Sequence, residues 1–360
     1  MREIEEIGAL EVLSSGVYSA LRFCAIGEPL LPNLKSLSLW PAIGKFIPHI
    51  TLFLSPRTTT ITIVFIEDDY SIVAVASLVA TLPTLCPNLE AICLRLLEID
   101  PMIIAAVSQM LLTTNLDTLR SLRVDSPFTE EAREVIYKLP GLCDLTAVIE
   151  RDTLLPSATL PNLANLTVQG DHDNDLLRVF HGATFGRLES VTFSSGSAQI
   201  GDFLEAFERV ALAASTQNTL TEFCLYASCS WHPNYLSLLP FTQLTTLFIE
   251  FLCDDGCVST VDDDVITNLA RTMPKLETLR LGDDPCHLIP TGVTVKGLVA
   301  LSHHCQDLST LRVHFQVASL SAPPGVGSNP RSITLRRECA LKELEVGGIP
   351  MPEEASWWSP

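Results

Sequence analysis

The sequence predicts an α/β solenoid, in which short parallel strands alternate with helical return segments. The main observation is a phrase that recurs along the chain with apolar residues in the spacing L-x-x-L-x-L. In residues 273–283, MPKLETLRLGD, the three positions are Leu276, Leu279 and Leu281. The same spacing occurs in LPNLKSLSLW, CPNLEAICLRL, LPNLANLTVQG, FGRLESVTFSS and CQDLSTLRVHF. A recurrence of this kind indicates stacked repeats rather than separate globular cores.

Twelve repeat units follow from this spacing, and each is named by the first position of its strand phrase. They begin at Leu34, Thr58, Leu89, Leu119, Leu142, Leu163, Leu188, Leu220, Leu244, Leu276, Leu308 and Leu341. Successive starts differ by 24, 31, 30, 23, 21, 25, 32, 24, 32, 32 and 33 residues. These periods straddle or exceed the roughly 20–29 residues of leucine-rich repeats, so we predict long helical returns in many units. The phrases at Thr58 and Leu142 are the most degenerate.

The segments between the phrases carry helix signals. Thr129 is placed to cap a helix whose first turn holds Glu130 and Glu131. Three aspartates at 262–264 stand at the start of another helix, whose apolar residues recur at helical spacing. Each unit is therefore expected to be a short strand followed by a helical return.

The predicted fold is a leucine-rich-repeat solenoid in the shape of a curved horseshoe. Parallel strands pack about 4.8 Å apart, whereas helices need roughly 10 Å. Strands are therefore expected on the concave face and helices on the convex face. Within each phrase the leucines point inward, and strand alternation turns the intervening side chains outward.

The domain organisation follows the repeats. Residues 1–30 form an N-terminal flank or cap, and residues 31–348 form the repeat domain of about twelve units. Residues 321–332, SAPPGVGSNPRS, are rich in Pro, Gly and Ser and are expected to be a flexible loop. Residues 349–360 form a C-terminal tail.

Composition excludes several classes of partner. The formal charge of −19 and the pI near 4.7 describe a surface that repels phosphate backbones, so no nucleic-acid partner is expected. Residues 70–89 and 101–116 lack charge, but we interpret both as buried helices and predict no membrane span. Eleven cysteines in no disulfide framework and an acidic N-terminus favour a cytoplasmic or nuclear protein.

Residues 276–313, LETLRLGDDPCHLIPTGVTVKGLVALSHHCQDLSTLRV, resemble the repeats of F-box/LRR proteins, especially the fungal ones. The resemblance lies in the strand phrase, the loop with Cys286 and the helix GLVALSHHCQDL, and it extends over about residues 31–348. It implies that the repeats hold a protein substrate. In that family an N-terminal F-box engages the adaptor of a cullin–RING ubiquitin ligase. Residues 1–30 are too few for that helical module, and we recognise no F-box in them.

The outward positions of the strand phrases are the candidate partner-binding residues, because arginine and aromatic side chains dominate protein interfaces. They are Trp40, Arg95, Arg123, Asp125, Glu222, Tyr226, Phe248, Glu250, Arg280, Arg312 and His314. Many other outward positions are Ser or Thr, which are also good β-surface residues without any binding role.

No cofactor, metal or catalytic site is expected. Residues 171–175, DHDND, begin like a calcium loop but lack its glycine and its glutamate, so a solvated acidic turn is favoured. Cys253 with Cys257, and residues 303–305 (His-His-Cys), have no partner pair at zinc-finger spacing. The chain also lacks the sequence signatures of serine hydrolases, zinc proteases and nucleotide-binding loops.

These observations predict a non-catalytic module that binds a protein partner on the concave face. The resemblance adds the expectation of a substrate receptor for a cullin–RING ubiquitin ligase, with a ligase adaptor as a second partner if an F-box lies upstream. The alternative is a free-standing leucine-rich-repeat scaffold with no role in ubiquitin transfer.

Overall fold

The computed structural model divides the chain into two compact units. Unit 1 comprises Met1–Gln169 and His181–Leu188, and unit 2 comprises Gly170–Phe180 and Glu189–Pro360. The residues that the structure describes are 16–17, 20–21, 29–39, 44–65, 70–95, 100–113, 116–149, 158–170, 176–180, 183–195, 203–214, 216–228, 234–252, 261–282, 292–313 and 343–345. The loop at 321–332, the tail at 349–360, the acidic turn at 171–175 and most of the N-terminal flank lie outside them.

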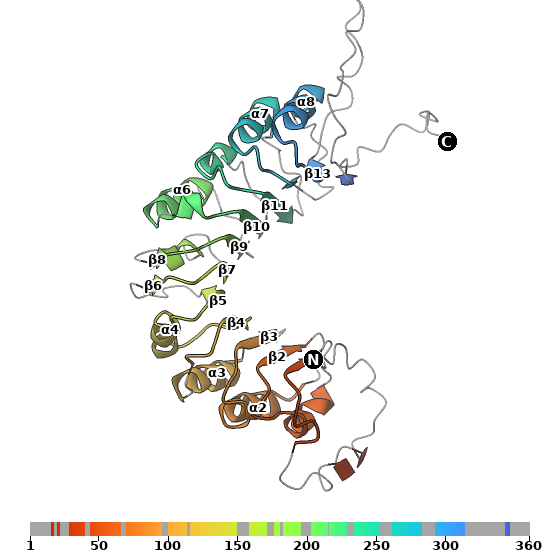
Figure 1. The fold of residues 1–360 in the computed structure, drawn as a ribbon, viewed down its shortest axis with the longest axis vertical. Helices are drawn as coiled ribbons and strands as arrows, with labels where there is room; N and C mark the ends of the chain where they lie inside the picture. The colour runs from red at the N-terminus through yellow and green to blue at the C-terminus, as the bar shows by residue number, and fades with distance from the viewer. Residues whose placement is uncertain are drawn as a thin grey trace, which may run out of the picture. The chain divides into compact units, whose positions relative to one another are not determined.

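Unit 1 is built on a strand ladder in the order β1-β2-β3-β4-β5-β7, and the pairs from β1 to β5 are parallel. These strands are β1 (Ser36–Leu39), β2 (Thr60–Val64), β3 (Ala91–Arg95), β4 (Ser121–Val124), β5 (Asp144–Ile149) and β7 (Asn165–Gly170). The returns contain η2 (Gly44–Leu52), α2 (Ile72–Leu85), α3 (Pro101–Thr113), α4 (Glu130–Ile136), β6 (Ala158–Leu160) and β8 (Ala183–Phe185). Helices α2, α3 and α4 lie on one side of the ladder (Figure 1).

Unit 2 repeats this plan with parallel strands in the order β9-β10-β11-β12-β13-β14. Its strands are β9 (Ser190–Ser195), β10 (Glu222–Ser228), β11 (Thr246–Leu252), β12 (Thr278–Leu281), β13 (Thr310–Val313) and β14 (Glu343–Glu345). Its returns contain η3 (Leu177–Phe180), α6 (Phe203–Ala213), η4 (Thr216–Asn218), η5 (Tyr235–Leu238), α7 (Asp263–Thr272) and α8 (Val295–His304). Helices α6, α7 and α8 lie on one side of this ladder (Figure 1). In each unit we call the opposite side the strand face.

A recurring hydrogen bond sets the register between neighbouring repeats. The carbonyl of Thr245 accepts from two consecutive amides of the next repeat, Glu277 N at 2.8 Å and Thr278 N at 3.0 Å. The same arrangement joins neighbouring repeats along the described part of both ladders, for example from Lys35 to residues 59–60 in unit 1. As a result, each strand begins two residues after the first position of its phrase, as Thr278 follows Leu276.

The phrase leucines form the core, as their spacing predicts. Leu276, Leu279 and Leu281 are 0, 0 and 3% exposed. The degenerate phrase places Thr58 at the first leucine position, where it is also fully buried. Its hydroxyl donates to the carbonyl of Leu34 at 3.1 Å, so the buried polar group is satisfied by the preceding repeat. The leucine-rich-repeat fold class is therefore confirmed.

The returns differ from the expectation that every unit carries a helix. The α-helices of ten or more residues, α2, α3, α6, α7 and α8, lie in units with periods of 30–32 residues. The described returns of units with periods of 21–25 residues hold 3₁₀ turns, the short strands β6 and β8, or the seven-residue α4. The reason is geometric. The chain between successive ladder strands is 15–20 residues long in the short units and 25–28 in the long ones. A short connection leaves little chain for a full helix once both connecting loops are made.

The core of unit 2 is centred on an aromatic cluster between α6 and the strands. Phe207 is fully buried, and its ring lies 4.9 Å from Phe223, 5.3 Å from Phe241 and 5.5 Å from Phe193, measured between centroids. Aromatic pairs at such separations add to the stabilisation that burial of their area provides. The cluster holds the helical return against the ladder behind the strands that carry most of the candidate binding residues.

The two charge-free stretches form buried helices, as predicted. Helix α2 buries Val75, Val79 and Leu82, and helix α3 buries Ile103 and Val107. Within the described ranges, no helix has both the length and the apolar character needed to cross a membrane.

Asp263 connects helix α7 to the start of helix α8. Its Oδ1 accepts from the amides of Thr294 and Gly297, both at 2.8 Å, and its Oδ2 accepts from the Thr294 hydroxyl at 2.6 Å. A Cβ on Gly297 would lie only 2.8 Å from the Asp263 carboxylate, which explains the glycine at this position. Burial alone would raise the pKa of Asp263, but these hydrogen bonds outweigh it and lower that pKa.

We expect Asp263→Ala to lower the free energy of unfolding by about 1 kcal/mol, as loss of a helix cap does. The control is Asp264→Ala on the same helix, which removes the same charge but only an exposed ion pair with Lys296. That control should cost less than about 0.5 kcal/mol. The measurement is the urea midpoint followed by circular dichroism, and equal losses in the two variants would contradict the described role of Asp263.

The stability difference between the wild type and Asp263→Ala should also depend on pH. Because the folded pKa of Asp263 is lowered, its stabilisation is complete above the unfolded pKa of about 3.9 and is lost as the pH falls through the folded value. The stability gap between the wild type and Asp263→Ala should therefore be largest near neutral pH and should narrow below about pH 4. A gap that stays constant down to acidic pH would show that the ionised carboxylate is not the hydrogen-bond acceptor.

Candidate functional site

The strand face of unit 1 carries ion pairs between neighbouring repeats. Arg95 Nε lies 3.1 Å from Asp125 Oδ2, and Arg123 Nη2 lies 3.6 Å from Asp144 Oδ1. Both arginine side chains are more than half exposed, so each pair contributes at most about 1 kcal/mol to stability. The outward charges of Arg95 and Arg123 are thus each paired with a carboxylate of the same chain.

The strand face of unit 2 presents its outward side chains in rows, because the parallel strands pair without slippage. One row runs across the strands through Cys224, Phe248, Arg280 and Arg312. In the next row Tyr226 on β10 is paired with Glu250 on β11. The preceding row runs from Ser190 through Glu222 and the threonines Thr246, Thr278 and Thr310 to Glu343.

An aromatic pair lies at the centre of these rows. The ring centroids of Tyr226 and Phe248 are 4.9 Å apart with a tilt of 39°. The guanidinium carbon of Arg280 lies 5.7 Å from the centroid of Phe248, a cation–π contact. Tyr226 is 36% exposed, so part of this side chain is open to solvent. The three side chains come from three successive strands: register places Phe248 beside Arg280, and Tyr226 lies diagonally across from Phe248.

Two carboxylates belong to the same surface. Glu250 is half-buried and is the register partner of Tyr226. The Glu222 carboxylate accepts from the Cys224 thiol at 3.8 Å, so it leans along β10 toward the aromatic pair. Across the part of the chain that the structure describes, no ion pair joins Glu222 or Glu250 to a lysine or arginine. In contrast to the ion-paired carboxylates of unit 1, Glu222 and Glu250 have no lysine or arginine partner among the described residues.

Burial and the neighbouring carboxylates shift the pKa values of Cys224 and Tyr226, the two titratable groups at the centre of this surface. Burial and the neighbouring Glu222 raise the pKa of the Cys224 thiol to about 12, so the thiol is neutral at physiological pH. Burial also raises the pKa of the Tyr226 phenol, and Cys224, Glu250 and Glu222 add to that effect while Arg280 opposes it. Both raised pKa values keep the thiol and the phenol in their neutral forms at physiological pH.

The sequence-predicted residues thus fall into three groups. Arg95, Arg123 and Asp125 lie on the strand face of unit 1, and Trp40 and His314 lie outside the described residues. The remaining residues are brought together on the strand face of unit 2, namely Glu222, Tyr226, Phe248, Glu250, Arg280 and Arg312. Sequence reasoning missed Cys224 and Asp144, although both occupy outward strand positions and could have been found by counting from the phrase start.

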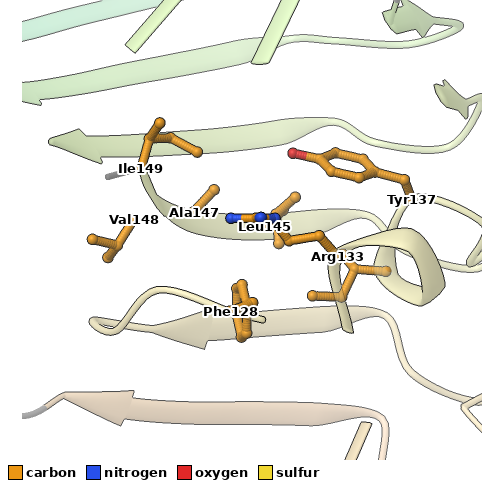
Figure 2. A pocket seen from close by; sticks show the side chains of 8 residues that line it. Phe128, Arg133, Tyr137, Leu145, Ala147, Val148 and Ile149 are labelled. Atoms are coloured by element: carbon orange, nitrogen blue, oxygen red, sulfur yellow. The ribbon is translucent and has the colours of Figure 1, made fainter. Parts of the chain in front are cut away.

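Unit 1 also contains a small internal cavity between α4 and β5 (Figure 2). Its volume is about 10 Å³, which is space for a single water molecule at most. In Figure 2 the Tyr137 hydroxyl points into the space above β5, and the Arg133 side chain reaches across Leu145. Burial raises the pKa of the Tyr137 phenol, and Arg133 only partly offsets that effect. The cavity is a packing feature and not a ligand site.

A second hollow, open to solvent, lies on the helix side of unit 2. Its volume is about 350 Å³, and it is lined by Glu205, Glu208, Arg209, Leu212, Asn234 and Ser237. The described residues contain no group of three or more His, Cys, Asp or Glu side chains arranged to hold a metal ion. Cys305, the last residue of the His-His-Cys sequence, is buried with its thiol 3.5 Å from the Met273 carbonyl and belongs to the core.

Comparisons with known proteins identify no family for this chain. No family model and no curated protein matches the chain. Among solved structures, the chain is similar to an internalin from Listeria monocytogenes, with 13% identity and a TM-score of 0.35 over 84% of this chain and 89% of the internalin. The assignment as a leucine-rich-repeat solenoid therefore rests on the strand register and the buried leucines described above.

The placement of Glu250 beside the Tyr226 ring can be tested by titration. We expect Glu250→Gln to lower the pKa of Tyr226, because it removes a negative charge that disfavours the phenolate. The measurement is the ¹³Cζ shift of labelled tyrosine against pH, with Tyr226→Phe used to assign the signal. An unchanged pKa would show that the carboxylate does not face the ring. Glu208→Gln, on the helix side, serves as the control and should leave the titration unchanged.

Proposed function

We propose that this chain is a non-catalytic interaction module that binds a protein partner on the strand face of unit 2. The observation that carries the proposal is the registered cluster of Tyr226, Phe248, Glu250, Arg280 and Arg312 on successive strands. Tyrosine and arginine side chains on a rigid surface are the residues that contribute most to protein–protein affinity.

The rigidity of the surface supports this proposal. The outward side chains stand on strands whose backbone groups are tied to both neighbours, so partner binding orders little additional chain. The leucines beneath them are fully buried, as are Phe193 and Phe207. Binding residues that are held by a packed core lose less conformational entropy on association than residues on a loop.

More specifically, we propose that the bound protein is a substrate, which the chain presents to a cullin–RING ubiquitin ligase. This form rests on the resemblance of residues 276–313 to F-box/LRR repeats. The alternative is a free-standing scaffold that binds its partner without any ligase. For both forms we propose action in the cytoplasm or nucleus, supported by the free thiols of the described Cys86, Cys93, Cys143, Cys224 and Cys305.

The binding surface is tested by reversing two charges on it. We expect Arg280→Glu combined with Arg312→Glu to reduce capture of partner proteins at least about tenfold, because it removes the cation–π contact with Phe248 and reverses two charges on the proposed binding surface. The measurement is quantitative mass spectrometry of proteins retained from a cell lysate by the wild type and by the variant.

The matched control for this experiment is Arg209→Glu combined with Arg271→Glu. It makes the same change in charge at exposed positions on α6 and α7, on the helix side of the same unit. Circular dichroism must show that both double variants are folded. Unchanged capture by the strand-face variant, or equal loss in the control, would place the binding site elsewhere.

The ligase role has a separate test. The full chain, expressed with an affinity tag, should co-purify the adaptor subunit of a cullin–RING ligase if it acts as a substrate receptor, and mass spectrometry identifies the subunit. Recovery of partner proteins without that adaptor would contradict the receptor role and favour the free-standing scaffold.

A further inference from the structure

Among the described residues, a cation lies against one ring of the aromatic pair on the strand face of unit 2. Arg280 lies 5.7 Å from the centroid of Phe248. Tyr226, at 4.9 Å on the other side of the pair, makes no such contact with any described lysine or arginine. The contact between Arg280 and Phe248 therefore indicates that a cationic side chain is a suitable ligand for the neighbouring Tyr226 ring.

The charges beside Tyr226 point to the same ligand chemistry. Its register partner Glu250 brings a carboxylate next to the ring, and Glu222 leans toward the pair from the other end of β10. Neither carboxylate is neutralised by an ion pair within the described ranges, whereas both arginines on the strand face of unit 1 have a carboxylate partner. The formal charge of −19 adds a long-range attraction for positively charged partners.

We propose that the partner presents a basic segment here, with a lysine or arginine side chain lying against the Tyr226 ring and its charge paired with Glu250. This inference rests on the proposed function, because it names the chemistry of the partner at the same strand face. A cation gains from both the ring face and the carboxylate, and an arginine or lysine stem also covers the exposed part of Tyr226. An acidic segment would meet Glu222 and Glu250 at this end of the surface and is disfavoured there.

The experiment uses a displayed library of random twelve-residue peptides selected against the full chain. We expect Lys and Arg to be enriched among the selected peptides. A selected peptide is then synthesised in two forms, with its basic residue intact and with that residue replaced by the neutral isostere norleucine or citrulline. Dissociation constants are measured for both peptides on the wild type and on Glu250→Gln.

We expect the losses of affinity caused by the peptide change and by Glu250→Gln to be non-additive. Neutralising the peptide or introducing Glu250→Gln should each weaken binding about tenfold, and the two changes together should weaken it little more than either alone. Glu208→Gln, which removes the same charge on the helix side, should leave the affinity within about twofold of wild type. Tyr226→Leu keeps the apolar bulk but removes the aromatic ring, and it should also reduce the preference for the basic peptide.

The contradictory outcomes separate this inference from the proposed function. One outcome would overturn the basic-segment inference alone. In it, the selected peptides lose binding with Tyr226→Leu, but they show no enrichment in Lys or Arg, or are rich in Asp and Glu. The strand face would then remain the binding surface. Additive losses from the peptide change and Glu250→Gln would also overturn it. Selected peptides that bind Tyr226→Leu and the Arg280→Glu, Arg312→Glu variant as well as wild type would contradict both, because their site lies elsewhere.

Discussion

The structure depends on a hydrogen bond that recurs from repeat to repeat. One carbonyl before each described junction accepts from two consecutive amides of the next repeat, as the carbonyl of Glu277 accepts from Ser309 N at 2.8 Å and Thr310 N at 3.0 Å. This bond fixes where each strand begins, and the strand start fixes which side chains turn inward. Because side chains alternate along a strand, a slip of one residue would turn the leucines outward and the candidate binding residues inward. The same backbone register therefore determines which side chains form the core and which lie on the strand face.

The strand positions could be predicted from the sequence because apolar spacing and backbone register express the same period. Even the degenerate phrases at Thr58 and Leu142 are followed by strands that start two residues later. The rows on the strand face also follow from counting, since Tyr226 and Glu250 both stand six residues after their phrase starts. The returns could not be predicted so well, because a pattern of apolar residues does not say whether a short crossover becomes a 3₁₀ turn, a strand or a helix. Nor does it give the rotamer that places Arg280 over Phe248.

The two strand faces show how one architecture carries different surfaces. In unit 1, Arg95 and Arg123 each form an ion pair with a carboxylate of the neighbouring repeat. In unit 2 an aromatic pair and a cation on one of its rings occupy rows next to two carboxylates that form no ion pair with a described lysine or arginine. Repeats supply the rows, and the residue at each outward position decides what the surface can recognise.

Amide hydrogen exchange at single-residue resolution tests the shared register most directly. The amides that donate to the preceding repeat in unit 2, those of Glu222, Thr246, Thr278 and Thr310, should exchange far more slowly than the same amides in an unfolded chain. Comparable protection is expected for Thr60 and Ala91 in unit 1. If these amides exchange at the rates of unstructured peptide, the repeats do not pair in this register, and the assignment of both the core and the strand face is wrong.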